Sequence, residues 1–326
     1  MKLAHLVIVT PNKCGLYETT RDLAHSLRKQ GIDARLIDPT YETNQLHPKT
    51  EEDRGVPLEK DLKWAEGADY LVNHSGMGKI ICRWDKPCIQ VAHGRPYSSF
   101  LLEANDSTAV YSYLYGQNKD RRVKAMVTFW PEHVPYWQAV MPDKPVYYVP
   151  SMCDLDVWTP AGPSHYNWSG LNGKINVLIT DPCRLDLSPY QAINCFLLWA
   201  RKQSGAKLHI FGKDYKGQKG WKVLLQILSE EGHLGETRGW VNSGLENLYR
   251  AADMVITSNE IETRTRREGM ACGCPVVKIA DIEKDQDKMT AALGVDRKAI
   301  REKAERMFNP ENSAKAFINM LSEIAA

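Results

Sequence analysis

Short, uninterrupted apolar runs separated by helix-length segments are the feature that most constrains the fold of this chain. In its first half such runs include "HLVIVT" (5–10), "DYLVNH" (69–74) and "CIQVAH" (88–93). Continuous rather than alternating hydrophobicity is typical of parallel strands that are buried on both faces. The segment 16–31 has the apolar spacing of an amphipathic helix and ends at Gly31. The sequence therefore predicts a doubly wound α/β sheet.

The pattern restarts after a segment rich in Pro, Gly, Ser and Asn, residues 154–173. Further apolar runs span 175–180, 207–212, 253–258 and 275–280. Two successive series of this kind predict two α/β domains, 1–160 and 161–326, with ligands at the carboxyl ends of the strands. An amphipathic helix is expected at 313–325. The polar segment 40–60 is expected to be a long loop or a short helix near a ligand.

Charge and cysteine usage exclude several classes of protein. The formal net charge of the 326 residues is +2, which argues against a dedicated nucleic-acid binder. The eight cysteines form no CxxC pair and no zinc-finger spacing, so free thiols in a reducing, cytoplasmic compartment are expected. Cys272 and Cys274 are expected to be packing residues, because two thiols without further ligands make a poor metal site. The N-terminal apolar run is too short to span a membrane.

A charged segment after the run 253–258 carries the strongest indication of chemistry. A short helix is expected to begin at about 263–265, with its free N–H groups and dipole suited to a phosphate. Glu268 lies about one turn into that helix, where its carboxylate could accept two hydrogen bonds from a ribose diol. Glu260 precedes the helix and would meet the next group, a sugar hydroxyl or anomeric centre. The plainer alternative is an ordinary helix with its charged residues in solvent.

Residues 251–277, "AADMVITSNEIETRTRREGMACGCPVV", resemble the donor-site signature of the retaining GT-B glycosyltransferases of family 4. That signature is a strand, a Glu-x7-Glu, a helix with small residues, Cys-Gly and Pro-Val-Val. Segments 15–38, 146–160 and 179–186 extend the resemblance over both domains. It implies two Rossmann-like domains facing a central cleft, an acceptor domain followed by a nucleotide-sugar donor domain. It also implies that the last helix, 313–325, packs back on the first domain.

The resemblance implies a role for each matching residue. Glu268 would bind ribose and Glu260 would contact the donor sugar. Arg184 would neutralise the departing diphosphate, whose negative charge a fixed guanidinium stabilises. Gly15 would let a first-domain loop approach the donor, and His93 would lie beside the transferred sugar. His93, Glu260 and Arg184 are therefore the expected catalytic residues.

The sequence departs from the family pattern at three places, one of which is residues 151–154, where "SMCD" replaces the family's "NGVD". Pro189 stands where the family has a lysine, and Thr263 stands where it has a phosphate-facing glycine. Phosphate neutralisation must then come from elsewhere, and Lys213, Arg264 or Arg266 could supply it. The contact with the phosphate at Thr263 is expected to differ from that made by the family's glycine.

The same residues also have plainer interpretations. Arg184 could form an ion pair with Asp186 or Asp181. His93 and His74, each at the end of an apolar run, could be histidines with purely structural hydrogen bonds.

The resemblance implies a retaining glycosyltransferase of the hexosyltransferase type, with a UDP- or GDP-sugar as donor. No tightly bound cofactor, metal or transmembrane segment is expected. A small molecule or glycan is the expected acceptor, with a hydroxylated nucleic acid as an alternative. Two rival functions remain: a nucleotide-sugar epimerase or hydrolase on the same fold, and a non-catalytic nucleotide-sugar-binding relative.

Overall fold

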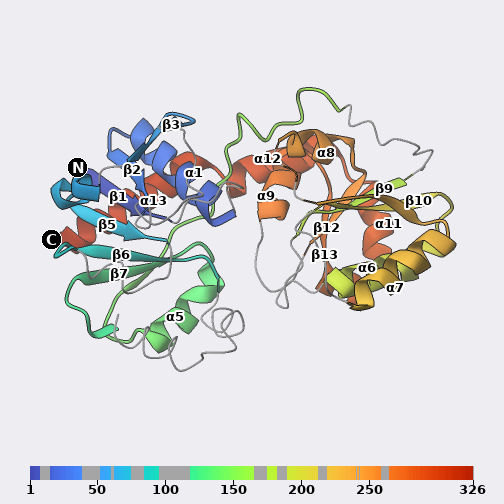
Figure 1. The fold of residues 1–326 in the computed structure, drawn as a ribbon, viewed down its shortest axis with the longest axis horizontal. Helices are drawn as coiled ribbons and strands as arrows, with labels where there is room; N and C mark the ends of the chain where they lie inside the picture. The colour runs from blue at the N-terminus through green and yellow to red at the C-terminus, as the bar shows by residue number, and fades with distance from the viewer. Residues whose placement is uncertain are drawn as a thin grey trace. The chain divides into compact units, whose positions relative to one another are not determined.

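The chain forms two compact units in the computed structural model. The first contains Met1–Met152 together with Met307–Ala326, and the second contains Cys153–Arg306 (Figure 1). The sequence placed the boundary at residue 160. The structure describes residues 1–7, 15–38, 52–59, 62–74, 84–94, 118–164, 175–181, 189–211, 219–239, 241, 243–257 and 264–325.

The first unit is built on an eight-stranded sheet in the order β3-β4-β2-β1-β5-β6-β7-β8. All its pairings are parallel except the antiparallel β3–β4 pair at one edge. The strands are β1 (Lys2–Leu6), β2 (Asp33–Ile37), β3 (Glu52–Asp53), β4 (Val56–Glu59), β5 (Tyr70–Asn73), β6 (Cys88–Ala92), β7 (Val123–Thr128) and β8 (Val146–Tyr148). Every residue of β6 is buried, as expected for a central parallel strand.

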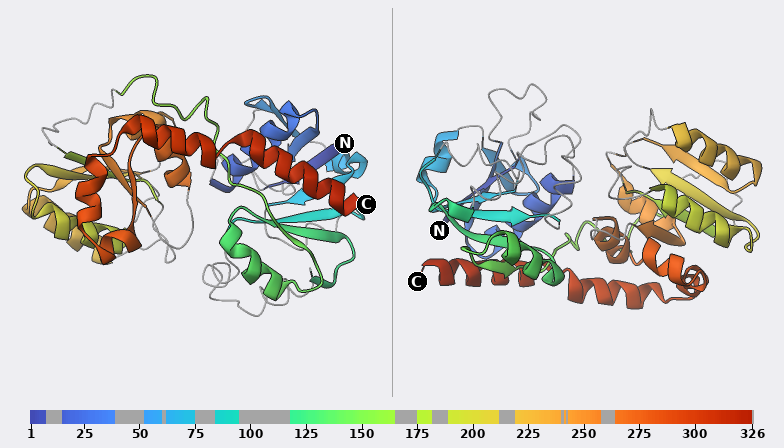
Figure 2. Two further views of the ribbon diagram at one scale, coloured as in Figure 1. Left: turned by 180° about the vertical axis from the view of Figure 1, so that it is seen from behind. Right: turned by 90° about the horizontal axis from the view of Figure 1, so that it is seen from below.

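The two faces of this sheet form separate hydrophobic cores. Along β1, Leu3 belongs to the core shared with α1 and α13, and the next residue, Ala4, belongs to the core shared with η1 and α5. This is the period-two alternation of a strand. The first unit's helices are α1 (Gly15–Lys29), η1 (Leu62–Gly67), η2 (Pro131–His133), α5 (Val134–Val140) and α13 (Pro310–Ala325). The C-terminal helix α13 therefore belongs to the first unit, where it runs beside α1 (Figure 2).

A glycine ends α1 as the sequence predicts. Gly31 has φ +81°. Its N–H donates to Arg28 O at 2.9 Å, and the N–H of Ile32 donates to Leu27 O at 3.1 Å. These two bonds are the Schellman arrangement, which satisfies the last carbonyl groups of a helix and requires a left-handed residue. The chain can then turn directly into β2.

The second unit is a five-stranded, wholly parallel sheet in the order β11-β10-β9-β12-β13. The strands are β9 (Ile175–Ile179), β10 (Ala206–Phe211), β11 (Leu234–Arg238), β12 (Met254–Thr257) and β13 (Val276–Lys278). The helices are α6 (Pro189–Ala200), α7 (Lys219–Glu230), α8 (Leu245–Ala251), α9 (Arg264–Ala271), α10 (Ile279–Lys284), α11 (Asp287–Leu293) and α12 (Arg297–Met307). Within the described part of the chain, no helix has the length and apolar character needed to cross a membrane.

Strands at or next to a sheet edge differ from the sequence prediction. The expected loop or short helix at 40–60 is wrong for the described residues 52–59, which form β3 and β4. Strand β4 is only four residues long and β11 reads "LGETR", so neither shows a continuous apolar run. Both lie toward an edge of their sheet, where less burial permits a polar sequence.

Candidate functional site

A buried carboxylate ties the start of α9 to the carboxyl end of the second unit's sheet. Asp181 follows β9 and is 4% exposed. Its Oδ2 accepts a hydrogen bond from the hydroxyl of Thr257, the last residue of β12, at 2.8 Å. Its Oδ1 accepts one from Thr265, in the first turn of α9, at 2.7 Å. The first turn of α9 is therefore anchored at the edge where ligands of parallel sheets bind.

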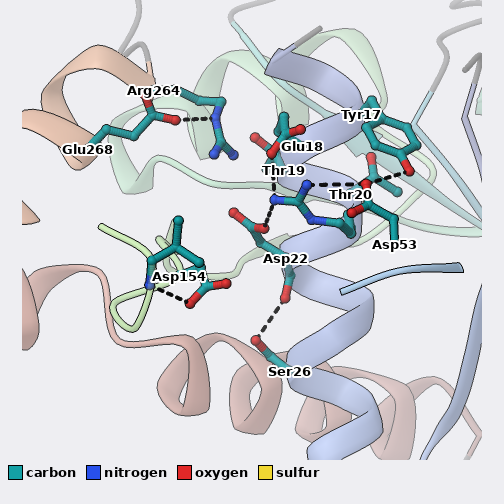
Figure 3. A network of polar contacts seen from close by, with 12 residues as sticks. Tyr17, Glu18, Thr19, Thr20, Asp22, Ser26, Asp53, Asp154, Arg264 and Glu268 are labelled. Carbon is teal, nitrogen blue, oxygen red and sulfur yellow. Dashed lines mark hydrogen bonds and ion pairs between the residues drawn. The ribbon is translucent and has the colours of Figure 1, made fainter. Parts of the chain in front are cut away.

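Glu268 is the buried acid of α9, and its side chain is 6% exposed. The Nε–H of Arg264, one turn earlier, donates to Oε1 at 2.6 Å. The hydroxyl of Tyr249, on α8, donates to Oε2 at 3.4 Å. Figure 3 shows the Arg264–Glu268 pair. Both carboxylate oxygens are thus oriented by neighbouring groups, Oε1 by a residue at the (i, i+4) spacing that brings helix side chains together and Oε2 by a residue of another helix.

The hydroxyl of Tyr249 joins these two groups of contacts. It lies 2.9 Å from Thr180 Oγ1, which in turn lies 3.0 Å from Thr265 Oγ1. Burial, and then the negative charge of Glu268, raise the pKa of Tyr249, so its hydroxyl stays protonated and can donate to the carboxylate. One continuous polar network therefore runs from Asp181 to Glu268.

The small residues after α9 have a structural explanation. Gly273 has φ +72°, and its N–H donates to Met270 O at 2.9 Å while that of Cys274 donates to Gly269 O at 2.8 Å. A Cβ at Gly273 would lie 3.0 Å from the carbonyl oxygen of Arg297. The helix thus ends in a second Schellman turn that only glycine fits without strain.

The thiols of Cys272 and Cys274 are packing groups. They are 1% and 0% exposed, and burial raises the pKa of each to about 12. The Cys274 thiol lies 3.5 Å from Ala252 O. No group of three His, Cys, Asp or Glu side chains suited to a metal ion occurs among the described residues.

In the first unit, His93 ends a chain of three hydrogen-bonded histidines. His93 follows β6, and its Nε2 lies 3.1 Å from Nδ1 of His74, which follows β5. The Nε2 of His74 lies 3.1 Å from Nδ1 of His5, in β1. His93 packs edge-on against Phe129, with ring centroids 5.3 Å apart. The structure therefore joins His93 to two histidines that no local sequence pattern connects with it.

Gly15, the other expected site residue of the first unit, is the first residue of α1 and is exposed. Its carbonyl oxygen accepts a hydrogen bond from the hydroxyl of Thr19 at 2.8 Å.

One turn further along α1 lies a buried ion network, part of which is drawn in Figure 3. Arg21, 2% exposed, contacts Glu18 at 2.5 Å, Asp22 at 2.8 Å and Asp53 at 3.4 Å. Asp53 also accepts a hydrogen bond from the hydroxyl of Tyr17 at 3.0 Å. Because Asp53 lies in β3, this network fastens that edge strand to α1.

Four of the expected site residues lie outside the described part of the chain. These are Arg184, Lys213, Glu260 and Thr263. Among the described ones, the structure brings Arg264 and Glu268 together. Asp181 and Tyr249 were missed as members of the site. Asp181 could have been found as a carboxylate immediately after an apolar run, whereas Tyr249 required the packing of α8 against α9.

Comparison with known proteins identifies the fold. No protein-family model matches the sequence, and no curated protein matches it. Sucrose-phosphate synthase from Thermosynechococcus elongatus superposes with a TM-score of 0.77 at 12% identity, over 99% of both chains. HepE from Anabaena, in complex with UDP and glucose, gives 0.69 at 15% identity, over 99% of this chain and 100% of that one.

A third solved structure has a similar fold. The pneumococcal O-GlcNAc transferase GtfA, in complex with UDP and GlcNAc, has a TM-score of 0.69 at 8% identity, over 100% of this chain and 99% of the other. These proteins are GT-B glycosyltransferases with two Rossmann-like domains. The GT-B fold expected from the sequence is therefore confirmed.

Proposed function

We propose that this chain, which has the GT-B fold, is a glycosyltransferase that moves a sugar from a nucleotide-sugar donor to an acceptor hydroxyl. Retention of anomeric configuration, a hexose as the transferred sugar and UDP or GDP as the nucleotide belong to the same proposal. Its support is the family-4 resemblance of residues 251–277, a full-length fold shared with glycosyltransferases, and the chemistry of the α9 site.

The observation that carries the proposal is the buried, doubly oriented carboxylate of Glu268. Each carboxylate oxygen has two lone-pair directions, so an oxygen that already accepts from Arg264 or Tyr249 can accept again. A vicinal diol offers two O–H donors at the spacing of the two carboxylate oxygens. Neither donation brings an uncompensated charge, because Arg264 balances Glu268. We therefore assign Glu268 to the ribose of the nucleotide.

The diphosphate is assigned to the groups around the start of α9. The helix presents its N-terminal dipole at the carboxyl edge of the sheet, which favours an anion. A guanidinium has five N–H donors, and the bond from Arg264 to Glu268 uses its Nε–H. Arg184 is assigned to the phosphates from the sequence resemblance, and Lys213, Thr263 and Arg264 are assigned to them because the lysine and glycine of the family pattern are replaced here by Pro189 and Thr263.

The proposed reaction breaks the bond between the anomeric carbon and the diphosphate oxygen. The acceptor oxygen forms its new bond on the same face, and its proton passes to the departing phosphate oxygen. Arg184 stabilises the charge that develops on the leaving group. Glu260 and His93 contact the transferred sugar. The first unit would bind the acceptor, a small molecule or glycan, and the second would bind the donor.

Ligand-induced stabilisation tests this assignment. UDP, GDP, ADP and their sugars are added singly to the purified protein while its melting temperature is followed, because a ligand that binds only the folded state raises it. One nucleotide is expected to stabilise the protein. Glu268→Gln should weaken its binding about 10- to 100-fold, as expected for lost hydrogen bonds to a charged group. Glu302→Gln, at an exposed position of α12, is the matched control and should bind normally.

Two outcomes would contradict the assignment. No stabilisation by any nucleotide would remove the donor assignment. Equal affinity in Glu268→Gln and the parent would remove Glu268 from the ribose site.

A further inference from the structure

The three histidines of the first unit form a diagonal path from the interior of the sheet to its carboxyl edge. His5 is paired with Val72, and His74 lies two residues beyond Val72. Val72 is paired with Ile89, and His93 lies four residues beyond Ile89. Each histidine is thus two residues nearer the carboxyl edge than the one before. Because side chains alternate along a strand, this spacing keeps all three on one face.

That face is the one covered by α1 and α13. Leu3 and Val7, which flank His5 at intervals of two, belong to its core. His5 is 0% exposed and lies against Phe317 of α13, with ring centroids 6.4 Å apart. His74 is 2% exposed and stacks on His5, with centroids 5.3 Å apart and planes inclined by 30°. Only His93 is partly exposed. The path therefore connects a wholly buried ring to a partly exposed one.

Both buried rings are neutral. Burial lowers the pKa of His5 to about 3 and lowers that of His74 well below its usual range, with repulsion from His93 and His5 contributing at His74. A neutral imidazole has one N–H and one bare nitrogen. Each of the two hydrogen bonds needs one of each, so with both buried rings neutral the hydrogen bonds can run along the path in only two directions.

The two arrangements differ at both ends of the path. In one, His93 donates from Nε2 to His74, His74 donates to His5, and His5 carries its proton on Nε2. In the other, His5 donates from Nδ1 to His74, His74 donates from Nδ1 to His93, and His93 carries its proton on Nδ1. The state of a wholly buried ring therefore determines whether Nε2 of His93 donates or accepts.

His5, the buried end of the path, determines which of the two arrangements is preferred. His5 Nε2 is buried and has no hydrogen-bond partner in the described part of the chain. Buried N–H groups without an acceptor are rarer in proteins than acceptors without a donor. A bare nitrogen at His5 Nε2 is thus preferred, which selects the arrangement in which every proton points toward His93.

We propose that His74 and His5 are positioning residues that hold His93 neutral, with its proton on Nδ1 and its Nε2 accepting from His74. His93 then acts as a hydrogen-bond donor to a substrate oxygen, not as a base. This inference rests on the proposed function only for the role of His93. The position of the proton is a property of the protein alone.

Nitrogen NMR of the ligand-free protein tests the proposal. Protein labelled with 15N-histidine gives distinct signals for protonated and bare ring nitrogens, and loss of signals in His93→Gln assigns those of His93. The parent is expected to show a single neutral form of His93 with Nδ1–H. A ring with its proton on Nε2, or one exchanging between both forms, would overturn the proposal.

Two substitutions at His74 separate positioning from simple packing. Asparagine places an amide N–H where His74 Nδ1 lies, so His74→Asn should keep the Nδ1–H form of His93. Leucine fills similar space without a hydrogen-bond donor, so in His74→Leu the ring of His93 should exchange between the Nδ1–H and Nε2–H forms. An unchanged spectrum in His74→Leu would overturn the proposal.

The same variants extend the test to catalysis once a donor is known. His74→Leu should lower kcat by up to about 100-fold, the loss that follows small misplacement of a reacting group, and His74→Asn should restore most of it. If no activity exists in any variant, the proposed function fails while the NMR result on the three histidines stands.

Discussion

His5 links the stability of the first unit to pH. Burial lowers its pKa from 6.5 to about 3. In the unfolded chain it regains the ordinary value, so between these limits the unfolded state binds a proton that the folded state does not. Stability therefore rises with pH across this range and falls as the solution is acidified. Lowering the pH from about 7.5 to about 5 should cost about 2 kcal/mol through His5 alone. His74, whose pKa is lowered by the same cause, adds a loss of the same sign.

The His5→Phe variant isolates this contribution. Phenylalanine keeps an aromatic ring against Phe317 but does not titrate, so the loss on acidification should shrink by about 2 kcal/mol. Urea unfolding of the first unit is followed by NMR of the methyl groups of Met126 and Met320. Both are buried in that unit, so they report on it and not on the second unit.

Ile37→Val is the matched control. Ile37 is fully buried in the neighbouring strand β2, and its shortening should cost about 0.5–1.5 kcal/mol at either pH. The loss on acidification should remain that of the parent, because no titrating group is removed. If His5→Phe loses as much stability as the parent between the two pH values, the neutral, buried state of His5 is refuted.

Three further substitutions or reactions test the packing. Gly269→Ala places a Cβ 2.9 Å from Val276 Cγ2, and urea unfolding should show the second unit destabilised by about 1–3 kcal/mol. Cys272 and Cys274, with pKa values raised to about 12 by burial, should resist a thiol reagent until the protein unfolds; mass spectrometry that finds either labelled in the folded protein would contradict their packing role. Arg21→Met removes a buried cation from three carboxylates and should cost about 3–5 kcal/mol; an unchanged urea midpoint of the first unit would contradict this estimate.

The central strands could be predicted from the sequence because parallel strands buried on both faces must be apolar throughout. The runs 69–74, 88–93 and 253–258 each contain a strand of the structure, whereas β1 begins at Lys2 and overlaps the run 5–10 only at His5 and Leu6. The edge strand β11 and β4, the second strand from an edge, cannot be recognised in this way, because each is only partly buried and its sequence is mixed.

Only part of the candidate site could be predicted from the sequence. Glu268 was predicted from its place one turn into a helix that follows a buried strand, and α9 begins at Arg264 as expected. The spacing of Arg264 and Glu268 permits an ion pair, but the sequence alone leaves Arg264 equally suited to a phosphate. The structure shows that Arg264 forms the ion pair with Glu268.

The histidine path required strand register, which no local pattern contains. In the sequence, His74 stands at the end of one apolar run and His5 at the start of another. Only the pairing of β1 with β5 and of β5 with β6 brings their rings into hydrogen-bonding distance of one another and of His93.

Product analysis of a donor reaction tests the central claim most directly. The purified protein is incubated with the nucleotide sugar that stabilises it, and proton NMR follows the anomeric signals from the first minutes, with water as acceptor where no other is known. The account predicts release of the nucleoside diphosphate and a sugar product that first appears in the anomeric configuration of the donor, with both lost in Arg184→Ala. A donor that stays intact, or a first product of inverted configuration, would contradict it.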